Sequence, residues 1–147
     1  MSINVELKKI GIIHTPYNRL SDCPIQPSRS QDVAEVEVFE EYKEGLLDLD
    51  GFSHIILLFI FHRSDGYSLK VKPFLDDHLR GLFATRAPRR PNPIGISVVR
   101  LIEIRDSILK VKGIDALNET PLIDIKPYVF EFDRRDDIKV GWLTDKI

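Results

Sequence analysis

The sequence predicts a mainly β protein, in which a small antiparallel sheet closes as a barrel or stacks as a sandwich. Seven stretches place β-branched and apolar residues at strand spacing. No series of long helices alternates with them, which excludes a doubly wound parallel sheet. The 147 residues, 43% hydrophobic and 30% charged, suit one globular domain with a real core. We expect about seven or eight strands and one or two short helices.

Periodicity defines the individual elements. In one stretch Val36 and Val38 alternate with acidic residues, as in a half-buried strand. A short amphipathic helix is expected over residues 39–48. Asp106 and Ser107 should form the tight turn of a hairpin. The predicted strands span residues 8–15, 33–39, 54–61, 67–72, 81–85, 94–105 and 108–117, of which 54–61 is apolar on both parities and should be the core strand.

Composition excludes several classes of protein. Cys23 is the single cysteine, which rules out an intrachain disulfide and a thiolate zinc cluster. The longest apolar run, residues 55–61, is far shorter than a membrane span, and the first residues do not resemble a signal peptide. We therefore expect a cytoplasmic protein that does not enter a membrane.

Charge is unevenly distributed along the chain. Residues 32–50 hold eight acids and one lysine, whereas residues 80–100 hold five arginines and no acid. Because the net charge is only −2, this division fits local phosphate recognition better than general coating of nucleic acid. On charge alone, a solvated basic loop is an equal alternative.

Three proline-punctuated loops are the strongest candidates for a binding site. The stretch "RAPRRPNPIG", residues 86–95, contains three prolines that restrict its backbone and three arginines suited to phosphate or carboxylate. The stretches "CPIQPSRS", residues 23–30, and "DALNETPLIDIKPY", residues 115–128, carry further polar side chains near turns. Together the three loops predict the rim of a pocket at the strand ends.

The histidines do not indicate a metal site. His54 and His62 flank the core strand eight residues apart, which separates them by about 26 Å in an extended chain. No metal is expected. His62, beside Arg63 at a strand end, is a candidate ligand-binding group, and no pattern indicates a covalent nucleophile.

Five stretches between about Ile10 and Asp133 form a specific combination: "IGIIHTPYN", "IQPS", "LDGFSHIILLFIFHR", "GLFATRAPRRPNPIGISVV" and "GIDALNETPLIDIKPY". In this combination the chain resembles the TrmO/TsaA-like family of S-adenosylmethionine-dependent tRNA N6-adenine methyltransferases. The resemblance implies a small β-barrel, a homodimer, and methylation of N6 of threonylcarbamoyladenosine at position 37, in the tRNA anticodon loop. It also implies S-adenosyl-L-methionine as cofactor.

By the same resemblance, motif positions assign the cofactor site. The family pattern has glycine in place of Ser28 and Glu119, glutamine in place of Arg63, and an aromatic residue in place of Arg89. The implied cofactor-binding residues are Gln26, Pro27, Ser28, His62, Arg63, Arg86, Ile96, Asp115, Ala116, Leu117 and Asn118.

Methyl transfer from a sulfonium requires alignment more than a covalent intermediate. Because the adenine N6 is a weak nucleophile, we expect Asp124 to accept its proton and Tyr128 to stack on the base. We expect Arg89, Arg90 and Lys126 to hold RNA phosphates or the threonyl carboxylate.

The same sequence leaves two other functions open. One is a non-catalytic barrel that binds a nucleotide or RNA, and the other is a methyltransferase of small molecules. For domain organisation we expect a TsaA-like barrel over residues 1–133. Residues 134–147 should form a tail that packs on the barrel or on a dimer partner through Trp142 and Leu143.

Overall fold

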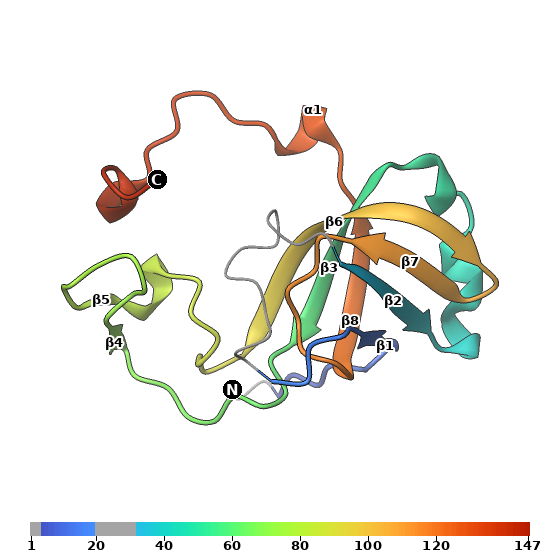
Figure 1. Cartoon of the computed structure of the whole chain (residues 1–147), viewed down its shortest axis with the longest axis horizontal. Helices are drawn as coiled ribbons and strands as arrows, with labels where there is room; N and C mark the ends of the chain where they lie inside the picture. Colours follow the sequence, from blue (N-terminus) through green and yellow to red (C-terminus); the bar gives the residue numbers. More distant parts are fainter. Residues whose placement is uncertain (1–3, 20–31) are drawn as a thin grey trace. The chain divides into compact units, whose positions relative to one another are not determined.

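In a computed structural model of the chain (Figure 1), residues 4–19 and 32–147 are described. Contacts divide the chain into two units. The barrel unit comprises the chain up to His62 and Ile94–Tyr128, and the second unit comprises Arg63–Pro93 and Val129–Ile147. The strands are β1 (Gly11–His14), β2 (Val33–Val38), β3 (His54–Ile60), β4 (Lys70–Val71), β5 (Arg80–Gly81), β6 (Ile94–Arg105), β7 (Ile108–Lys112) and β8 (Thr120–Pro127).

Short helices connect some of these strands. None of them, within the described ranges, is long and apolar enough to cross a membrane. The helices are the 3₁₀ helices η3 (Glu40–Leu46), η4 (Leu49–Gly51), η5 (Leu82–Ala84) and η6 (Gly141–Leu143), and the single-turn α1 (Phe130–Asp133).

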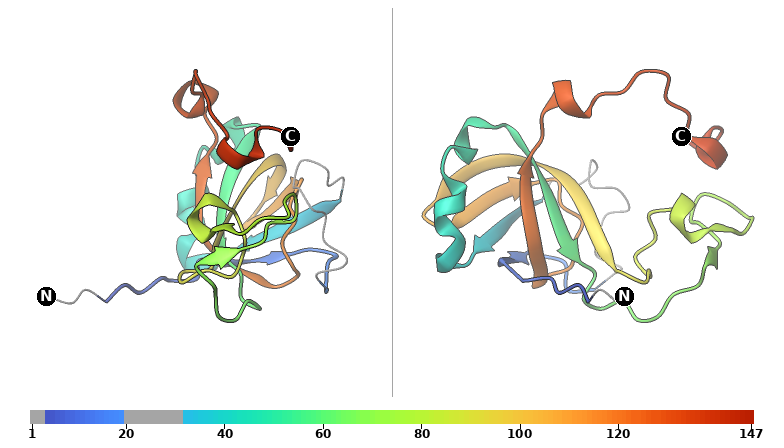
Figure 2. Two further views of the ribbon diagram at one scale, coloured as in Figure 1. Left: turned by 90° about the vertical axis from the view of Figure 1, so that its left-hand side faces the viewer. Right: turned by 180° about the vertical axis from the view of Figure 1, so that it is seen from behind.

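Six strands close the barrel in the order β1-β2-β7-β6-β3-β8, and the further views in Figure 2 show them curving around one interior. Every neighbouring pair is antiparallel. The predicted antiparallel barrel is therefore confirmed, but six strands close it rather than the seven or eight expected. The remaining two strands, β4 and β5, pair with each other in the second unit.

Alternation along the strands builds the core of the barrel. In β3 the side chains of Ile55, Leu57 and Phe59 point inward and are buried, while those between them are only partly buried. The prediction of a core strand is met by the inward-facing parity, and the apolar residues of the other parity lie on the outer face of the closed sheet. The predicted hairpin is also present, with Arg105 opposite Ile108 across the two-residue turn.

Gly95, in the "NPIG" part of the basic loop motif, permits a close contact between β6 and β3. A Cβ at this position would lie 2.4 Å from Cε2 of Phe59 and 2.8 Å from Cζ of Phe61. Because Phe59 is 2% exposed in the core, it has little room to move. The glycine is thus required by packing.

Several elements differ from the prediction, among them the strands expected at 67–72 and 108–117, of which only Lys70–Val71 and Ile108–Lys112 form. β8 was not expected, because the prolines and polar residues of 115–128 are typical of turns, yet Pro121 and Pro127 lie in or at the end of this strand. Most of the strand expected at 81–85 is the 3₁₀ helix η5. The helix expected over 39–48 is present as η3, a 3₁₀ helix.

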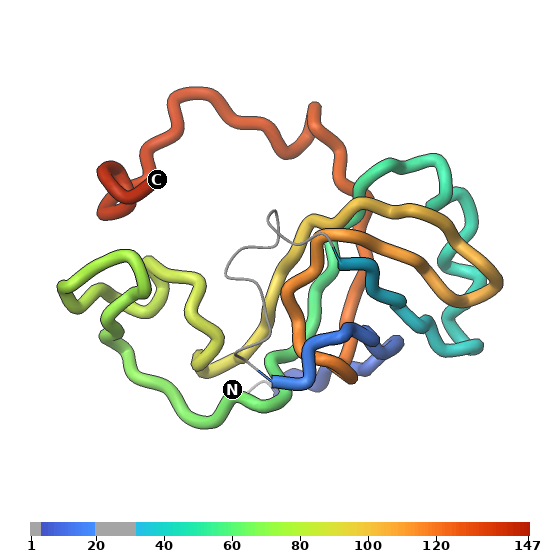
Figure 3. The backbone as a smooth tube through the Cα atoms, viewed as in Figure 1, coloured from blue at the N-terminus to red at the C-terminus, as the bar shows by residue number. Residues whose placement is uncertain are grey.

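The first segment of the second unit, Arg63–Pro93, interrupts the barrel sequence between β3 and β6. The path can be followed in Figure 3, where the chain leaves β3, forms β4 and β5, and returns as β6. Ile60 and Ile94 are paired residues, so the insertion begins and ends at the same end of the barrel. The predicted division into residues 1–133 and 134–147 stays a prediction.

Candidate functional site

Hydrogen bonds between two loops build the end of the barrel that carries Asp115–Asn118. Thr15, just after β1, donates from its backbone N to Oδ1 of Asn118 over 3.0 Å and from Oγ1 to the carbonyl oxygen of Ala116 over 2.9 Å. Asn118 N donates to the carbonyl oxygen of Tyr17 over 2.7 Å. The loop before β8 is therefore held by the segment after β1.

Asp115 is the partly buried carboxyl group of this loop. Ser97, inward-facing on β6 and 3% exposed, donates from Oγ to Oδ1 of Asp115 over 3.2 Å. Burial raises the pKa of Asp115 above its ordinary value, and the hydrogen bond from Ser97 only partly opposes this effect. An ionised Asp115 is consequently under-solvated and suited to accept hydrogen bonds from a ligand hydroxyl or ammonium group.

Thr15 and Tyr17 were not among the predicted site residues. Tyr17 is 5% exposed and its hydroxyl donates to Oδ2 of Asp32 over 2.6 Å. Both lie in the "HTPYN" stretch, whose proline and asparagine were a signal for a structured turn. The partners of Thr15, Ala116 and Asn118, are about a hundred residues away in sequence, so motif spacing does not reveal these contacts.

His62 and Ile96 belong to the same end of the barrel as Asp115–Asn118. His62 follows β3 by two residues, and Ile96 lies near the start of β6, opposite Leu58. Ile96 is 53% exposed on the outer side of the sheet, since its neighbour Ser97 points inward. The structure thus brings together the predicted cofactor residues His62, Ile96, Asp115, Ala116, Leu117 and Asn118 at one end of the barrel unit.

Of the two predicted catalytic residues, Asp124 lies on β8 in the same row as Leu58 and Ile96, whereas Tyr128 follows the strand. Asp124 is opposite Leu58 and forms a 3.0 Å ion pair with Nζ of Lys126. Tyr128 follows the far end of β8, where its backbone N donates to the carbonyl oxygen of His54 over 3.1 Å. The first and last of the eight residues of β8 are separated by about 23 Å. Within one chain, Tyr128 is therefore remote from Asp115–Asn118.

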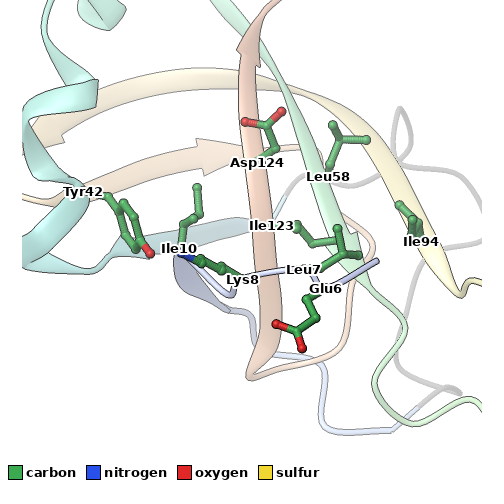
Figure 4. A pocket seen from close by; sticks show the side chains of 9 residues that line it. All are labelled: Glu6, Leu7, Lys8, Ile10, Tyr42, Leu58, Ile94, Ile123 and Asp124. Atoms are coloured by element: carbon green, nitrogen blue, oxygen red, sulfur yellow. The ribbon is translucent and has the colours of Figure 1, made fainter. Parts of the chain in front are cut away.

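Asp124 also lines a hollow of about 500 Å³ on the outside of the barrel unit (Figure 4). Its wall is mostly apolar, with the side chains of Leu7, Leu58 and Ile123 around it and the carboxyl groups of Glu6 and Asp124 at its borders. This surface is distinct from the loop that Asp115 occupies.

The predicted residues of the basic loop belong to the second unit. Residues 85–93 form neither helix nor strand, as the prolines require. Arg86 and Arg89 are exposed, whereas Arg90 is partly buried. Nη1 of Arg90 donates to the carbonyl oxygens of Thr85 and Ala87, each over 3.0 Å. Arg63 is exposed at the start of the same unit.

Gln26, Pro27 and Ser28, predicted to contact the cofactor, lie outside the described residues, as does Cys23. Among residues 4–19 and 32–147, no three histidine, cysteine, aspartate or glutamate side chains gather as metal ligands would.

Comparison with protein families identifies the chain. The model of the tRNA-methyltransferase O N-terminal domain matches residues 12–134. The chain belongs to this family. The match includes the whole barrel sequence from β1 to β8 apart from Gly11, and the insertion between β3 and β6.

Individual relatives agree with the family. A probable S-adenosyl-L-methionine-binding protein of Pyrococcus abyssi is 52% identical over 141 residues, which cover 95% of this chain and 77% of the relative. The human tRNA (adenine(37)-N6)-methyltransferase is 32% identical over 143 residues, but the chain covers only 32% of it. A crystal structure of TrmO from Pseudomonas aeruginosa superposes with a TM-score of 0.81 at 36% identity, covering 95% of this chain and 62% of that one.

Proposed function

We propose that the chain transfers a methyl group from S-adenosyl-L-methionine to N6 of adenine 37 in tRNA, with threonylcarbamoyladenosine as the modified base. The family match over residues 12–134 carries this proposal. Relatives named as S-adenosyl-L-methionine-binding proteins and as tRNA (adenine(37)-N6)-methyltransferases support it. The methyl acceptor, the cytoplasmic location and the homodimer stay predictions.

The end of the barrel at Asp115 has the chemistry that the donor requires. S-adenosyl-L-methionine supplies an electrophilic methyl group on a sulfonium, along with ribose hydroxyls and a cationic amine. Burial raises the pKa of Asp115, so its ionised carboxylate is stabilised when a ligand hydroxyl or ammonium group donates a hydrogen bond to it. Asn118 and Thr15 hold the backbone of this loop in place before any ligand binds.

The chain's contribution to the reaction is alignment. A displacement at the methyl carbon needs the acceptor nitrogen in line with the leaving sulfur, and no covalent enzyme intermediate. A loop fixed by hydrogen bonds at both Ala116 and Asn118 supplies the rigidity for that alignment. The proton of N6 needs an acceptor. Asp124 stays our predicted acceptor. Tyr128 stays the predicted stacking residue, although within one chain it follows the end of β8 that is remote from the loop of Asp115.

Contacts to tRNA are assigned to exposed cations. Arg89 is exposed on the second unit, and Lys126 is exposed on β8 beside Asp124. Guanidinium and ammonium groups at such positions neutralise phosphates and make binding dependent on salt. Arg86 and Arg63 stay predicted contacts of the donor.

Mass spectrometry of tRNA nucleosides tests the proposal. Unmethylated tRNA that carries threonylcarbamoyladenosine is incubated with the protein and S-adenosyl-L-methionine, and one added methyl on that nucleoside is expected. Asp115→Ala, which removes the carboxyl group, should abolish the product. An unchanged nucleoside profile with retained RNA binding would instead indicate a non-catalytic barrel, and equal activity on the free nucleoside would indicate a small-molecule enzyme.

A further inference from the structure

The basic loop of the second unit contains arginines in two different environments. Arg86 and Arg89 are exposed, and Arg90 is partly buried against the loop. Nη1 of Arg90 donates to the carbonyl oxygens on both sides of Arg86, those of Thr85 and Ala87. Its guanidinium carbon also lies 5.9 Å from the centre of the Phe83 ring. Arg90 therefore fixes the backbone that presents Arg86.

Threonine hydrogen bonds continue this brace within the loop. Oγ1 of Thr85 donates to the carbonyl oxygen of Leu82 over 2.7 Å and accepts from the backbone N of Ala87 over 3.3 Å. Leu82 is 1% exposed, and its backbone N donates to the carbonyl oxygen of Leu69. The base of the loop is thus anchored in the small β4–β5 sheet region.

The C-terminal tail adds a second support to the same loop. Nε1 of Trp142, in η6, donates to the carbonyl oxygen of Ala84 over 2.8 Å. The Trp142 ring lies 5.6 Å from the guanidinium of Arg80, and Nε of Arg80 donates to Asp76 over 2.5 Å. Trp142 thus binds the carbonyl oxygen of Ala84, and Arg90 binds that of Thr85, the next residue, so the tail and Arg90 hold adjoining peptide groups.

We propose that Arg90 and Trp142 are positioning residues, which hold the basic loop so that Arg86 and Arg89, rather than Arg90, meet the anionic oxygens of the substrates. The inference rests on the proposed function for the identity of those substrates. The anionic group can be the carboxylate of the methyl donor or a phosphate of tRNA, since both accept bidentate guanidinium contacts. Preorganisation by Arg90 and Trp142 reduces the entropy lost when the loop binds.

The test compares Arg90→Met with Arg89→Met in the full chain. Each variant removes one positive charge from the loop, but only Arg90→Met removes two hydrogen bonds to the backbone. Hydrogen exchange of residues 85–90 should become faster in Arg90→Met and in Trp142→Phe, and should stay unchanged in Arg89→Met. Thermal unfolding of the variants, followed in parallel, reports any general loss of the fold.

Ligand binding then separates positioning from contact. S-adenosyl-L-methionine is titrated by calorimetry and tRNA by filter binding at several salt concentrations. Arg89→Met should lower the salt slope of tRNA binding by about 1, as expected when a phosphate contact is lost. Arg90→Met should lower the affinity for the ligand that the loop holds by about tenfold, with the salt slope of tRNA binding unchanged. Arg90→Lys should not restore that affinity.

Two outcomes would overturn the inference if the wild-type chain methylates tRNA. One is unchanged hydrogen exchange in Arg90→Met, and the other is a salt slope of tRNA binding that Arg90→Met lowers as much as Arg89→Met does. Loss confined to calorimetry would assign the loop to the donor carboxylate, and loss confined to filter binding would assign it to RNA. A wild-type chain that binds neither ligand would overturn the binding role of the loop and the proposed function together.

Discussion

Single side chains at the end of the barrel depend on partners that are distant in sequence. Asp115 was predicted from its motif, but its hydrogen bond from Ser97 arises only because β6 and β7 are neighbours in the closed sheet. Likewise, the contact of Thr15 with Asn118 needs β1 and β8 to meet. The sequence therefore indicated the polar residues of the site and not their environment, which depends on closure.

Asp115→Asn should stabilise the barrel at neutral pH. The folded-state pKa of Asp115 is raised by burial, so its contribution to stability is present below the unfolded pKa and is lost as pH rises through the folded pKa. Urea unfolding should give the variant a higher midpoint than wild type at pH 7 and a similar one at pH 3. Asp50→Asn, an exposed control, should not show this pattern, and donor affinity of Asp115→Asn should fall.

Glu119→Gly should stabilise the fold by about 0.5–1 kcal/mol. Glu119 has φ +66° in the turn before β8, a left-handed conformation that is costly for a residue with a Cβ. The midpoint of urea unfolding measures the change. Glu35→Gly, in the exposed face of β2, should instead lose about 1 kcal/mol; an equal loss at Glu119 would contradict the role of its backbone conformation.

Among the elements, strong apolar alternation was predictable and proline-containing strands were not. Periodicity correctly indicated the positions of β2, β3, β6 and β7, although β7 is shorter than the expected 108–117. β8 was missed because its prolines are typical of turns. Pro121 is the second residue of the strand, opposite Ile12 of β1, and Pro127 is the last, so neither proline takes a hydrogen-bond donor from the middle of the strand. In η5 and η3, local hydrogen bonding favoured 3₁₀ geometry that spacing does not distinguish.

Gly95→Ala should destabilise the barrel by about 1–3 kcal/mol, because the added Cβ overlaps the ring of Phe59. Denaturant unfolding measures the loss. Gly45→Ala in η3 is the control, since a Cβ there meets nothing within 4 Å. A Gly95→Ala variant as stable as wild type would show that Phe59 can move aside.

Asp76→Asn should loosen the segment that supports Trp142. Burial alone would raise the pKa of Asp76, but hydrogen bonds from Arg80, His78 and two backbone amides outweigh it and lower the pKa below its ordinary value. The stabilisation is hence present above the unfolded pKa and is lost as pH falls. Trp142 is the single tryptophan, so its emission should shift to the red in the variant at pH 7. Asp77→Asn, at an exposed neighbour, should leave the emission unchanged.

On the scale of the whole molecule, the inserted segment 63–93 and the barrel unit differ in charge. The inserted segment 63–93 holds seven basic and three acidic residues. The barrel unit holds ten basic and fifteen acidic residues. The asymmetry seen in the sequence thus follows the boundary between the barrel unit and the inserted segment, and it favours the predicted phosphate recognition by the insertion. The boundaries themselves were not predictable, because 63–93 has no compositional break that resembles a linker.

Replacing residues 63–93 with a short turn should leave the barrel folded. Ile60 and Ile94 are already paired on adjacent antiparallel strands, so β3 and β6 would become an ordinary hairpin. Circular dichroism and thermal unfolding would measure the shortened chain, which should retain cooperative unfolding and lose binding of tRNA. An unfolded product would show that the barrel depends on the insertion.

The paired ends of β3 and β6 also bear on how such a protein can change over generations. An insertion that starts and finishes at neighbouring residues adds little closure entropy as it lengthens, about 0.6 kcal/mol for each doubling. New recognition segments can be acquired there without altering the register of any barrel strand. Selection can therefore act on the sequence of the insertion and on the stability of the barrel separately, because the chain of the insertion joins the barrel at the paired ends of β3 and β6.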